Sequence, residues 1–303
     1  MKSIEGILAV AFIAAILGAS SVCLAAITDI NESDPYVLEP EARDELIAFV
    51  NEARDFVVEQ GKDKALEVFS DHNGEFVRGE HYIIAYDFNG TRLAHPYQPE
   101  GIGKNALNVT DLNGVTSTRN MRDVAKRGSG FAYYVWPNPA HSNAEELKLT
   151  YVLKVDEELW LGAGDYLPVQ APIFSNESRE GLVAFVNGAR DFALNTTQEE
   201  ALKAFNDKNG TFVEGDLYIW AYDFAGNTLA HPIKPELIGK NNVDLLDPNG
   251  VEFIRDMIAL AQSEGGFTYY LYPNPARNMT QGLKLSYVTK VDDTWWLGSG
   301  IYA

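Results

Sequence analysis

The stretch YIIAYDFNGTRLAHP at residues 82–96 returns 136 residues later as YIWAYDFAGNTLAHP at residues 218–232. In each copy two apolar or aromatic runs flank a glycine that can adopt the positive φ of a tight turn, which predicts a β-hairpin. In the same register Arg43–Tyr166 aligns with Arg179–Tyr302 without a gap, and 64 of the 124 positions are identical. Solenoid repeats of about 20–50 residues stack to share one core, whereas units of this length are complete domains. The chain is therefore a tandem duplication.

Apolar periodicity predicts the remaining elements of each copy. Residues 46–57 and 182–192 carry apolar side chains at helical spacing, which predicts an opening helix, and a short second helix is expected at 65–69 and 201–205. After the hairpin the pattern predicts one more helix, at 115–126 and 251–262, and then three strands, at 130–136, 147–155 and 159–166 in the first copy and at 266–272, 283–291 and 295–302 in the second. Each copy is thus expected to be an α+β domain with an antiparallel sheet of about five strands.

The domain boundaries follow from the same alignment. We expect an N-terminal segment at 1–27, a first domain at 35–167, a linker at 168–176 and a second domain at 177–303. The linker contains Pro168 and Pro172 and has no helical pattern. The two copies are therefore expected to fold as separate globules joined by a short, fairly stiff connector.

Two features indicate export. The run from Gly6 to Ile27 carries no charge and ends in small residues, which predicts either a cleaved signal peptide or an N-terminal membrane anchor. The one cysteine, Cys23, lies in this run, so no disulfide is expected elsewhere. Seven Asn-X-Ser/Thr triplets predict a glycoprotein, unless they only reflect a surface rich in Ser and Thr; they begin at Asn31, Asn89, Asn108, Asn176, Asn195, Asn209 and Asn278. The protein is expected to be secreted, or tethered to the outer face of the cytoplasmic membrane.

Charge and motif content exclude several functions. The net charge of -19, a pI near 4.6 and the lack of a Lys/Arg cluster argue against nucleic-acid binding. The sequence has no Gly-X-Ser-X-Gly elbow, no phosphate loop and no carboxylate pair retained in both copies, so we do not expect an enzyme. It has no retained Asp/Glu/His cluster with metal-ligand spacing, so neither a metal nor another cofactor is expected.

Several retained motifs together carry a family resemblance. The string 218–232, with IGKN at 238–241, DPNG at 247–250, GGFTYY at 265–270 and WLGSGIY at 296–302, resembles Cache domains of the single-Cache type 2 family, and the first copy carries similar motifs. The resemblance extends from about residue 42 to the C-terminus. It implies a bacterial or archaeal, PAS-like extracytoplasmic fold that holds a small ligand, commonly a two- or three-carbon carboxylate, between the sheet and its covering loops and helices.

The resemblance also implies an arrangement that this sequence does not follow. Family members usually precede a membrane span and a chemotaxis, kinase or cyclase domain, whereas this sequence ends at Ala303 without such an output domain. Any signal is therefore expected to pass through a membrane signalling or transport partner, or through the N-terminal anchor.

Histidine and lysine are the first candidate ligand-binding residues. His95 and His231 each end a strand before a proline, beside a loop that carries Lys104 or Lys240. A neutral imidazole and an ammonium together suit a carboxylate or carbonyl oxygen, although a strand-end histidine can equally be structural.

Aromatic residues and a strand lysine complete the candidate site. Tyrosine rings can fill a core, or they can close a small pocket and direct a hydroxyl at a polar ligand. Lys148 and Lys284 are either pocket cations or solvated strand residues. The aromatic candidates are Tyr82, Tyr133, Tyr134 and Trp136, and their counterparts Tyr218, Tyr269, Tyr270 and Tyr272.

Other retained polar residues are expected to be structural. Asp87 and Asp223 precede the hairpin turn and can accept backbone N–H bonds there, and the Asn-Gly steps at 113–114 and 249–250 fit a turn and helix entry. Arg54 and Arg190 are expected to pair with the neighbouring aspartate or to reach a carboxylate ligand. The function indicated is an extracytoplasmic, sensor-type protein that binds small carboxylates or related metabolites. The alternative is a structural or adhesive cell-surface protein that uses these folds as spacers.

Overall fold

The computed structural model describes residues 35–303. The expected signal peptide or anchor at 1–27, with Cys23, and the triplet at Asn31 lie outside the described residues. Within the described part, residues 35–303 belong to a single compact unit that contains both repeats. No helix in this part of the chain is both long and apolar enough to cross a membrane.

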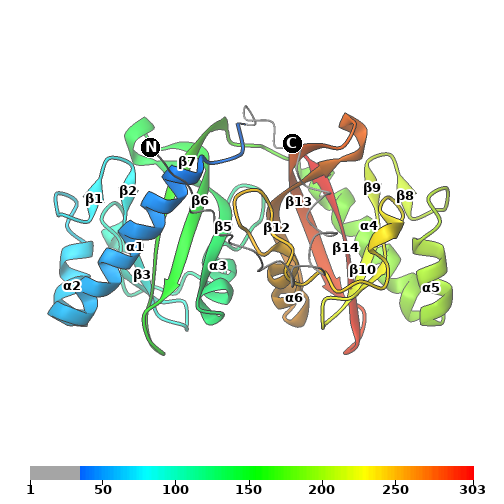
Figure 1. Ribbon diagram of the computed structural model, residues 1–303, viewed down its shortest axis with the longest axis horizontal. Coiled ribbons are helices and arrows are strands. Elements are labelled where there is room, and N and C mark those ends of the chain that lie inside the picture. The colour runs from blue at the N-terminus through cyan, green and yellow to red at the C-terminus, as the bar shows by residue number, and fades with distance from the viewer. Residues whose placement is uncertain (1–34) are drawn as a thin grey trace, which may run out of the picture. The chain divides into compact units, whose positions relative to one another are not determined.

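The first repeat runs from α1 to β7 (Figure 1). Its elements are α1 (Pro40–Gln60), α2 (Lys62–Phe69), β1 (Val77–Arg78), β2 (His81–Tyr82), β3 (Ile84–Tyr86), β4 (Arg92–Ala94), the 3-10 turn η2 (Pro99–Gly101), α3 (Ser117–Lys126), β5 (Ser129–Asn138), η3 (Pro139–His141), β6 (Ala144–Lys154) and β7 (Trp160–Gln170). A proline in the first turn begins α1, and its buried stripe covers the sheet.

The second repeat has the same elements in the same order. They are α4 (Asn176–Leu194), α5 (Gln198–Phe205), β8 (Val213–Glu214), β9 (Leu217–Tyr218), β10 (Trp220–Asp223), β11 (Thr228–Ala230), η4 (Pro235–Leu237), α6 (Phe253–Gln262), β12 (Gly266–Asn274), η5 (Pro275–Arg277), β13 (Thr280–Lys290) and β14 (Trp295–Tyr302). A capping box formed by Thr197 and Glu200 begins α5.

Both repeats build the same sheet. The strand order is β4-β3-β7-β6-β5 in the first repeat and β11-β10-β14-β13-β12 in the second, and every pairing is antiparallel. The expected α+β class and the two five-stranded sheets are therefore confirmed. Asp87 and Asp223 accept the N–H of Thr91 and Asn227 at 2.7 and 2.8 Å, as expected at a hairpin turn. Gly90 and Gly226 supply the positive φ of that turn.

Two details differ from the sequence prediction. The expected single strand from Tyr82 to Phe88 is split into β2 and β3, and β2 pairs with β1 in a small separate sheet, as β9 does with β8. The strand β7 continues through Pro168 to Gln170, so the start of the expected linker is part of the first sheet. Pro168 is exposed, and proline is tolerated near a strand end where its missing N–H breaks no ladder bond.

The two faces of each sheet have different partners. In the first repeat α1 packs on β6 and β7, and its stripe Leu46, Phe49, Val50, Ala53 and Val57 joins one core. The helix α3 packs on β5 and β6, and Met121 and Val124 join a second core that contains Tyr82, Tyr134 and Trp160. Alternation along the strands therefore puts Tyr133 on the face of α1 and Tyr134 on the face of α3.

The two repeats also contact each other, and the contact is reciprocal. Asn113 donates from Nδ2 to the hydroxyl of Tyr269 at 2.7 Å, and Asn249 donates from Nδ2 to the hydroxyl of Tyr133 at 2.6 Å. Because Asn249 and Tyr269 are the counterparts of Asn113 and Tyr133, residue i meets residue j and j meets i. This is the pattern of a two-fold symmetric dimer interface, here formed within one chain.

The same asparagines hold the segments that precede the opening helices. Oδ1 of Asn113 accepts the N–H of Phe174 at 3.0 Å, and Oδ1 of Asn249 accepts the N–H of Leu38 at 2.8 Å. Each Asn-Gly turn of one repeat is thus tied to the chain that leads into the helix of the other repeat.

The expectation of separate globules was therefore wrong. The copies form one compact unit, and one hydrophobic core contains residues of both repeats, including Val135 and Leu271. The two asparagines are fully bonded and 0% exposed, so they are interface residues and not merely turn formers. The proline content of the linker does not predict this, because a stiff connector still permits the domains that it joins to pack together.

Candidate ligand-binding site

Each repeat has a buried aromatic and polar site on the sheet face that α3 or α6 covers. In the second repeat these side chains leave a cavity of about 10 Å³, close to the space of one water molecule. Its walls come from β9, β10, the end of β11, α6, β12 and β13. They are Tyr218, Trp220, Tyr222, His231, Phe253, Ile254, Met257, Tyr270, Tyr272 and Lys284.

A buried lysine lies in each site. Lys148 on β6 is 2% exposed and Lys284 on β13 is 0% exposed, so neither is a solvated strand residue. Each lysine passes over a glycine of the neighbouring strand: a Cβ on Gly164 would lie 2.8 Å from Cε of Lys148, and a Cβ on Gly300 would lie 2.7 Å from Cε of Lys284. The glycine is therefore required for the lysine to lie in this position.

Aromatic rings surround the two ammonium groups. Nζ of Lys148 lies 3.9 Å from the ring centroid of Tyr82 and 4.3 Å from that of Tyr166. Nζ of Lys284 lies 4.3 Å from the ring centroid of Tyr218 and donates to its hydroxyl at 2.9 Å. Among residues 35–303, no carboxylate oxygen lies within 4.0 Å of either ammonium. Burial therefore dominates and lowers the pKa of each lysine to about 7.

The retained histidines present one defined donor. Nδ1 of His95 accepts the N–H of Tyr97 and of Gln98, both at 3.2 Å, and Nδ1 of His231 accepts the N–H of Lys234 at 3.0 Å. Because Nδ1 is an acceptor, the neutral ring carries its proton on Nε2. Burial, with help from nearby cations, lowers the pKa of His95 well below its usual value and that of His231 to about 3. Both rings are neutral at physiological pH and offer Nε2–H to the site.

Tyrosine hydroxyls are oriented by the sheet. The hydroxyl of Tyr134 accepts a hydrogen bond from Thr150 at 3.1 Å, and the hydroxyl of Tyr166 donates to the carbonyl of Pro137 at 2.8 Å. The second repeat repeats the latter bond, since Tyr302 donates to the carbonyl of Pro273 at 2.9 Å. Burial raises the pKa of Tyr134 and Tyr166 far above the usual value, so these groups stay protonated. The site therefore combines neutral donors with one titratable cation.

Most of the expected site residues come together. In the first repeat Tyr82 lies against His95 with ring centroids 5.3 Å apart, Tyr134 lies against Trp136 at 5.8 Å, and Lys148 lies over Tyr82. In the second repeat the corresponding residues line the cavity: Tyr218, His231, Tyr270, Tyr272 and Lys284.

Two pairs of expected residues lie elsewhere. Lys104 and Lys240 are exposed, because the loop that carries them turns its lysine toward solvent. Tyr133 and Tyr269 lie on the opposite face of the sheet, where their hydroxyls accept from the asparagines of the other repeat. The two retained arginines of the opening helices have different partners. Arg54 pairs with Asp55 at 2.7 Å, as expected, whereas Arg190 donates to the carbonyl of Lys290 at 2.8 Å.

The sequence analysis missed a second cation in each site. Arg92 of the first repeat is 7% exposed, and it donates to the hydroxyl of Tyr86 at 2.9 Å and to Gln98 at 2.8 Å. Lys234 of the second repeat lies 4.5 Å from the ring centroid of Tyr272. Comparison of the copies could not reveal either residue, because threonine and glutamine stand at the equivalent positions 228 and 98. Tyr166 and Tyr302, in contrast, are retained and could have been found.

The two sites differ in how fully they are filled. Phe253 stacks on Tyr270 with centroids 4.7 Å apart and an interplanar angle of 5°, and Trp220 contacts Trp296 edge-on at 5.5 Å. The first repeat has Ser117 and Ile84 at the positions of Phe253 and Trp220. Larger side chains therefore occupy the site of the second repeat.

Metal binding has no support in the described part of the chain. Within residues 35–303 no group of three or more His, Cys, Asp or Glu side chains is arranged to hold a metal ion. The donors that meet in the two sites are a lysine, a neutral imidazole N–H and phenol hydroxyls, which suit an anionic oxygen.

Comparison with known proteins identifies related sequences. A family model described as the Cache domain matches residues 48–303, which includes most of both repeats. The sensor histidine kinase MctS of Rhizobium johnstonii is 36% identical over 88 residues, 29% of this chain and 19% of that protein. The methyl-accepting chemotaxis protein McpP of Pseudomonas putida is 27% identical over 131 residues, 42% of this chain and 23% of that protein.

A solved structure is also among the similar proteins. The crystal structure of a methyl-accepting chemotaxis protein from Vibrio parahaemolyticus is 33% identical, covers 41% of this chain and 81% of that chain, and has a TM-score of 0.33. The matches to the two curated relatives span about a fifth of the length of those proteins.

Proposed function

Because the chain belongs to the Cache domain family, we propose that it is an extracytoplasmic, sensor-type protein that binds small carboxylates or related metabolites in both repeats. Its two curated relatives are a sensor histidine kinase and a chemotaxis receptor. A ligand-bound form would pass its signal to a membrane signalling or transport partner. The proposal involves no catalysis, cofactor or nucleic acid.

The observation that carries the proposal is a buried lysine in each site with no carboxylate of residues 35–303 in ion-pair contact; Asp165 and Glu80 act on Lys148 only from a greater distance. Taking an ammonium out of water is costly unless a partner compensates for the lost hydration. Lys148 and Lys284 have tyrosine rings and hydroxyls around them but, among the described residues, no carboxylate within 4.0 Å. A bound carboxylate would supply the missing charge, so the site is complementary to an anion.

The neighbouring donors fix how such a ligand would lie. The Nε2–H of His95 or His231 and the hydroxyl of a pocket tyrosine can donate to the oxygen that the lysine does not contact. The aromatic rings would then enclose a short apolar tail. The cavity of about 10 Å³ in the second repeat must widen for this. A two- or three-carbon acid requires the smallest opening.

The surface supports export. All six described Asn-X-Ser/Thr triplets begin at an exposed asparagine, as glycan attachment would require: Asn89, Asn108, Asn176, Asn195, Asn209 and Asn278. We propose that the protein is secreted, or tethered to the outer face of the cytoplasmic membrane by residues 1–27, and that these asparagines are glycosylated.

One observation favours a second candidate function. The site of the second repeat is nearly filled by its own side chains, with Phe253 stacked on Tyr270. A structural or adhesive cell-surface protein would have filled sites of this kind in both repeats. Under this alternative the buried lysines would be remnants of a binding ancestor.

Calorimetric titration of residues 28–303 with acetate, propionate, pyruvate and lactate tests the proposal, with ethylamine as the cationic control. We expect at least one acid to bind, Lys148→Met to abolish binding in the first repeat, and Lys284→Met to abolish it in the second. Lys154→Met is the matched control, because this lysine lies on the same strand as Lys148 and bonds to Glu157 at the surface.

The outcomes separate the two candidate functions. Binding of acids by the wild type and its loss in the double variant support ligand sensing. If no acid binds and ethylamine does, the charge assignment is wrong. If neither acids nor ethylamine bind, the spacer function is favoured.

A further inference from the structure

A groove between α3 and α6 lies apart from the two ligand sites. Its volume is about 430 Å³, in the range of small-molecule sites, and none of its lining residues lines the cavity of the second repeat. The first repeat contributes residues 122–127 to its wall, and the second contributes 255–263 together with Phe224 and Val243. The groove therefore exists only because the two repeats pack together.

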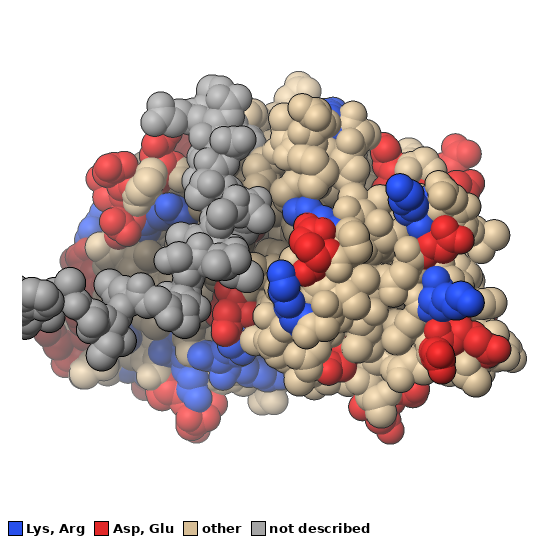
Figure 2. All heavy atoms as spheres, turned by 45° about the vertical axis from the view of Figure 1, so that its right-hand side comes forward, with Lys and Arg blue, Asp and Glu red and all other residues tan. Residues whose placement is uncertain are grey.

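The two walls of the groove have different chemistry. On α3 the wall carries Arg122 and Lys126, whereas the equivalent positions on α6 hold Ile258 and Gln262. On the second side Ile258, Phe224 and Val243 form an apolar stretch beside the polar Arg255, Gln262 and Ser263. Four of the eleven lining residues are basic and one is acidic, in a chain of net charge -19. In Figure 2 a group of Lys and Arg side chains lies at the lower edge of the molecule, between Asp and Glu side chains and uncharged surface.

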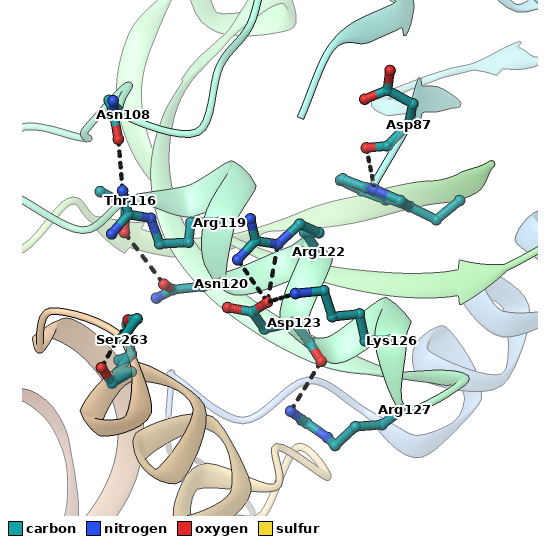
Figure 3. A network of polar contacts seen from close by, with 12 residues as sticks. Asp87, Asn108, Thr116, Arg119, Asn120, Arg122, Asp123, Lys126, Arg127 and Ser263 are labelled. Atoms are coloured by element: carbon teal, nitrogen blue, oxygen red, sulfur yellow. Dashed lines mark hydrogen bonds and ion pairs between the residues drawn. The ribbon is translucent and has the colours of Figure 1, made fainter. Parts of the chain in front are cut away.

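The positive charge of the groove is unevenly compensated. Arg127 pairs with Asp256 at 2.5 Å and with Glu252 at 3.2 Å across the two repeats. Arg122 and Lys126 instead share the single carboxylate of Asp123, at 2.8 and 3.0 Å, as Figure 3 shows. At this end of the groove two cations therefore share one carboxylate, whereas Arg127 has two carboxylates.

Arg255 lies on the opposite side of the groove and pairs with Asp244 and Glu252. Nε of Arg255, on the opposite side of the groove, is buried and makes no hydrogen bond within residues 35–303. It lies 3.5 Å from Glu252, outside hydrogen-bond geometry.

We propose that this groove binds a soluble organic monoanion with an apolar body, such as an aromatic or branched carboxylate or sulfonate. Its anionic group lies between Arg122 and Lys126, and its body lies against Ile258, Phe224 and Val243. This ligand class is larger and more apolar than the acids proposed for the two buried sites. Because the groove has walls from both repeats, such a ligand also stabilises the packed arrangement of the repeats by mass action.

Fluorescence titration with 8-anilinonaphthalene-1-sulfonate tests the proposal, since this probe joins a sulfonate to an apolar ring system. We expect saturable binding with one dominant site on residues 28–303. The double variant Arg122→Ile, Lys126→Gln carries the residues that the second repeat has at these positions, and it should bind about tenfold more weakly because charge-assisted contacts are lost. Lys203→Gln, an exposed lysine change on α5, is the matched control and should bind as the wild type does.

A second measurement locates the probe. In a ¹H–¹⁵N correlation spectrum the probe should shift amide signals of α3 and α6, and saturating propionate should not displace it. If the double variant binds the probe as tightly as the wild type, or if the shifts fall outside α3 and α6, the proposal is overturned. Displacement by propionate would also overturn it, because the probe would then occupy a buried site. None of these outcomes depends on whether the buried sites bind acids.

Discussion

Asn249 of the second repeat donates to the hydroxyl of Tyr133 in the first repeat at 2.6 Å, and Tyr133 is the chain neighbour of Tyr134, whose ring belongs to the core on the ligand-site face. The strand β5 therefore presents the repeat interface on one face and the site on the other. The counterpart pair, Asn113 and Tyr269, gives β12 the same two roles. A shift of either strand on ligand binding would move an interface hydrogen bond, which couples each site mechanically to the contact between repeats.

The first prediction concerns the strength of this contact. Asn249→Ala removes three hydrogen bonds of a fully buried side chain, to Tyr36, Leu38 and Tyr133. Partners left unsatisfied cost more than the bonds themselves, so we expect the free energy of unfolding to fall by about 2–4 kcal/mol. Urea unfolding followed by tryptophan fluorescence measures it.

Pseudo-symmetry gives this experiment an internal comparison. Asn113→Ala should cost about as much as Asn249→Ala, because its side chain makes the equivalent bonds to Pro172, Phe174 and Tyr269. The exposed Asn195→Ala, which loses one bond to the carbonyl of Asp191, should change stability by under about 1 kcal/mol. Equal effects of all three changes would show that the interface is not a stabilising contact.

The second prediction separates stability from binding. Lys148→Met should leave the ligand-free protein as stable as the wild type or more stable by about 1 kcal/mol at pH 6, because replacing a buried charge by an apolar side chain of similar length relieves its desolvation. The same change should abolish acid binding in the first repeat. Thermal unfolding with and without propionate measures both. A large loss of stability in the ligand-free variant would mean that the lysine is a structural residue.

Much of this site could be predicted from the sequence. The residues that could not be predicted share one reason. The duplication shows which residues both copies retain, and His95, Tyr82, Tyr134 and Lys148, which the structure brings together, are among them. It gives no signal for Arg92, whose counterpart is a threonine. Retention in both copies also does not reveal which way a side chain points: Lys104 is retained, and its side chain is exposed.

The contact between the repeats could not be predicted from the sequence for a related reason. Tyr133 and Asn249 are 116 residues apart in sequence, and their side chains form a hydrogen bond with each other. A comparison of copies shows that both asparagines and both tyrosines are kept, but it does not show that they meet. The Asn-Gly step has a sufficient local explanation as a turn, which concealed the long-range bond.

The third prediction is a pH dependence of binding. The pKa of Lys148 and Lys284 is lowered to about 7 in the ligand-free protein, mainly by burial, and a bound carboxylate favours the charged form. Binding therefore takes up a proton when the pH is above about 7 and none when it is well below. The affinity for propionate should be constant near pH 6 and fall by up to about tenfold per pH unit above 7.

The same two lysines should make the free energy of unfolding depend on pH in the opposite direction to the affinity. A lysine whose folded pKa lies below its unfolded value is protonated more fully in the unfolded chain between these two values, so stability without ligand should rise from pH 7 toward 10. For the binding prediction, calorimetric titration with propionate in buffers of different ionisation enthalpy measures the proton uptake that accompanies binding. A pH-independent affinity in the wild type would contradict the assignment of the lysine as the anion-binding group.

The last prediction concerns the glycine beneath each lysine. In Gly164→Ala the new methyl would lie 2.3 Å from Oγ1 of Thr150 and 2.7 Å from the carbonyl oxygen of Leu149, as well as 2.8 Å from Cε of Lys148. Because the carbonyl is backbone and cannot swing away, the strand pair must shift. We expect a loss of about 1–3 kcal/mol and weaker acid binding in the first repeat, with binding in the second repeat unchanged.

A helical glycine provides the matched control for this change. Gly188 lies within α4, where a Cβ would meet no atom within 4 Å, so Gly188→Ala should stabilise the protein by about 0.5–1 kcal/mol. Urea unfolding of both variants and propionate titration of each distinguish a local clash from a general effect of the added methyl. If Gly164→Ala unfolds at the wild-type urea concentration and binds propionate normally, the lysine does not need the room that glycine leaves. The retained Gly–Lys pair would then require another explanation.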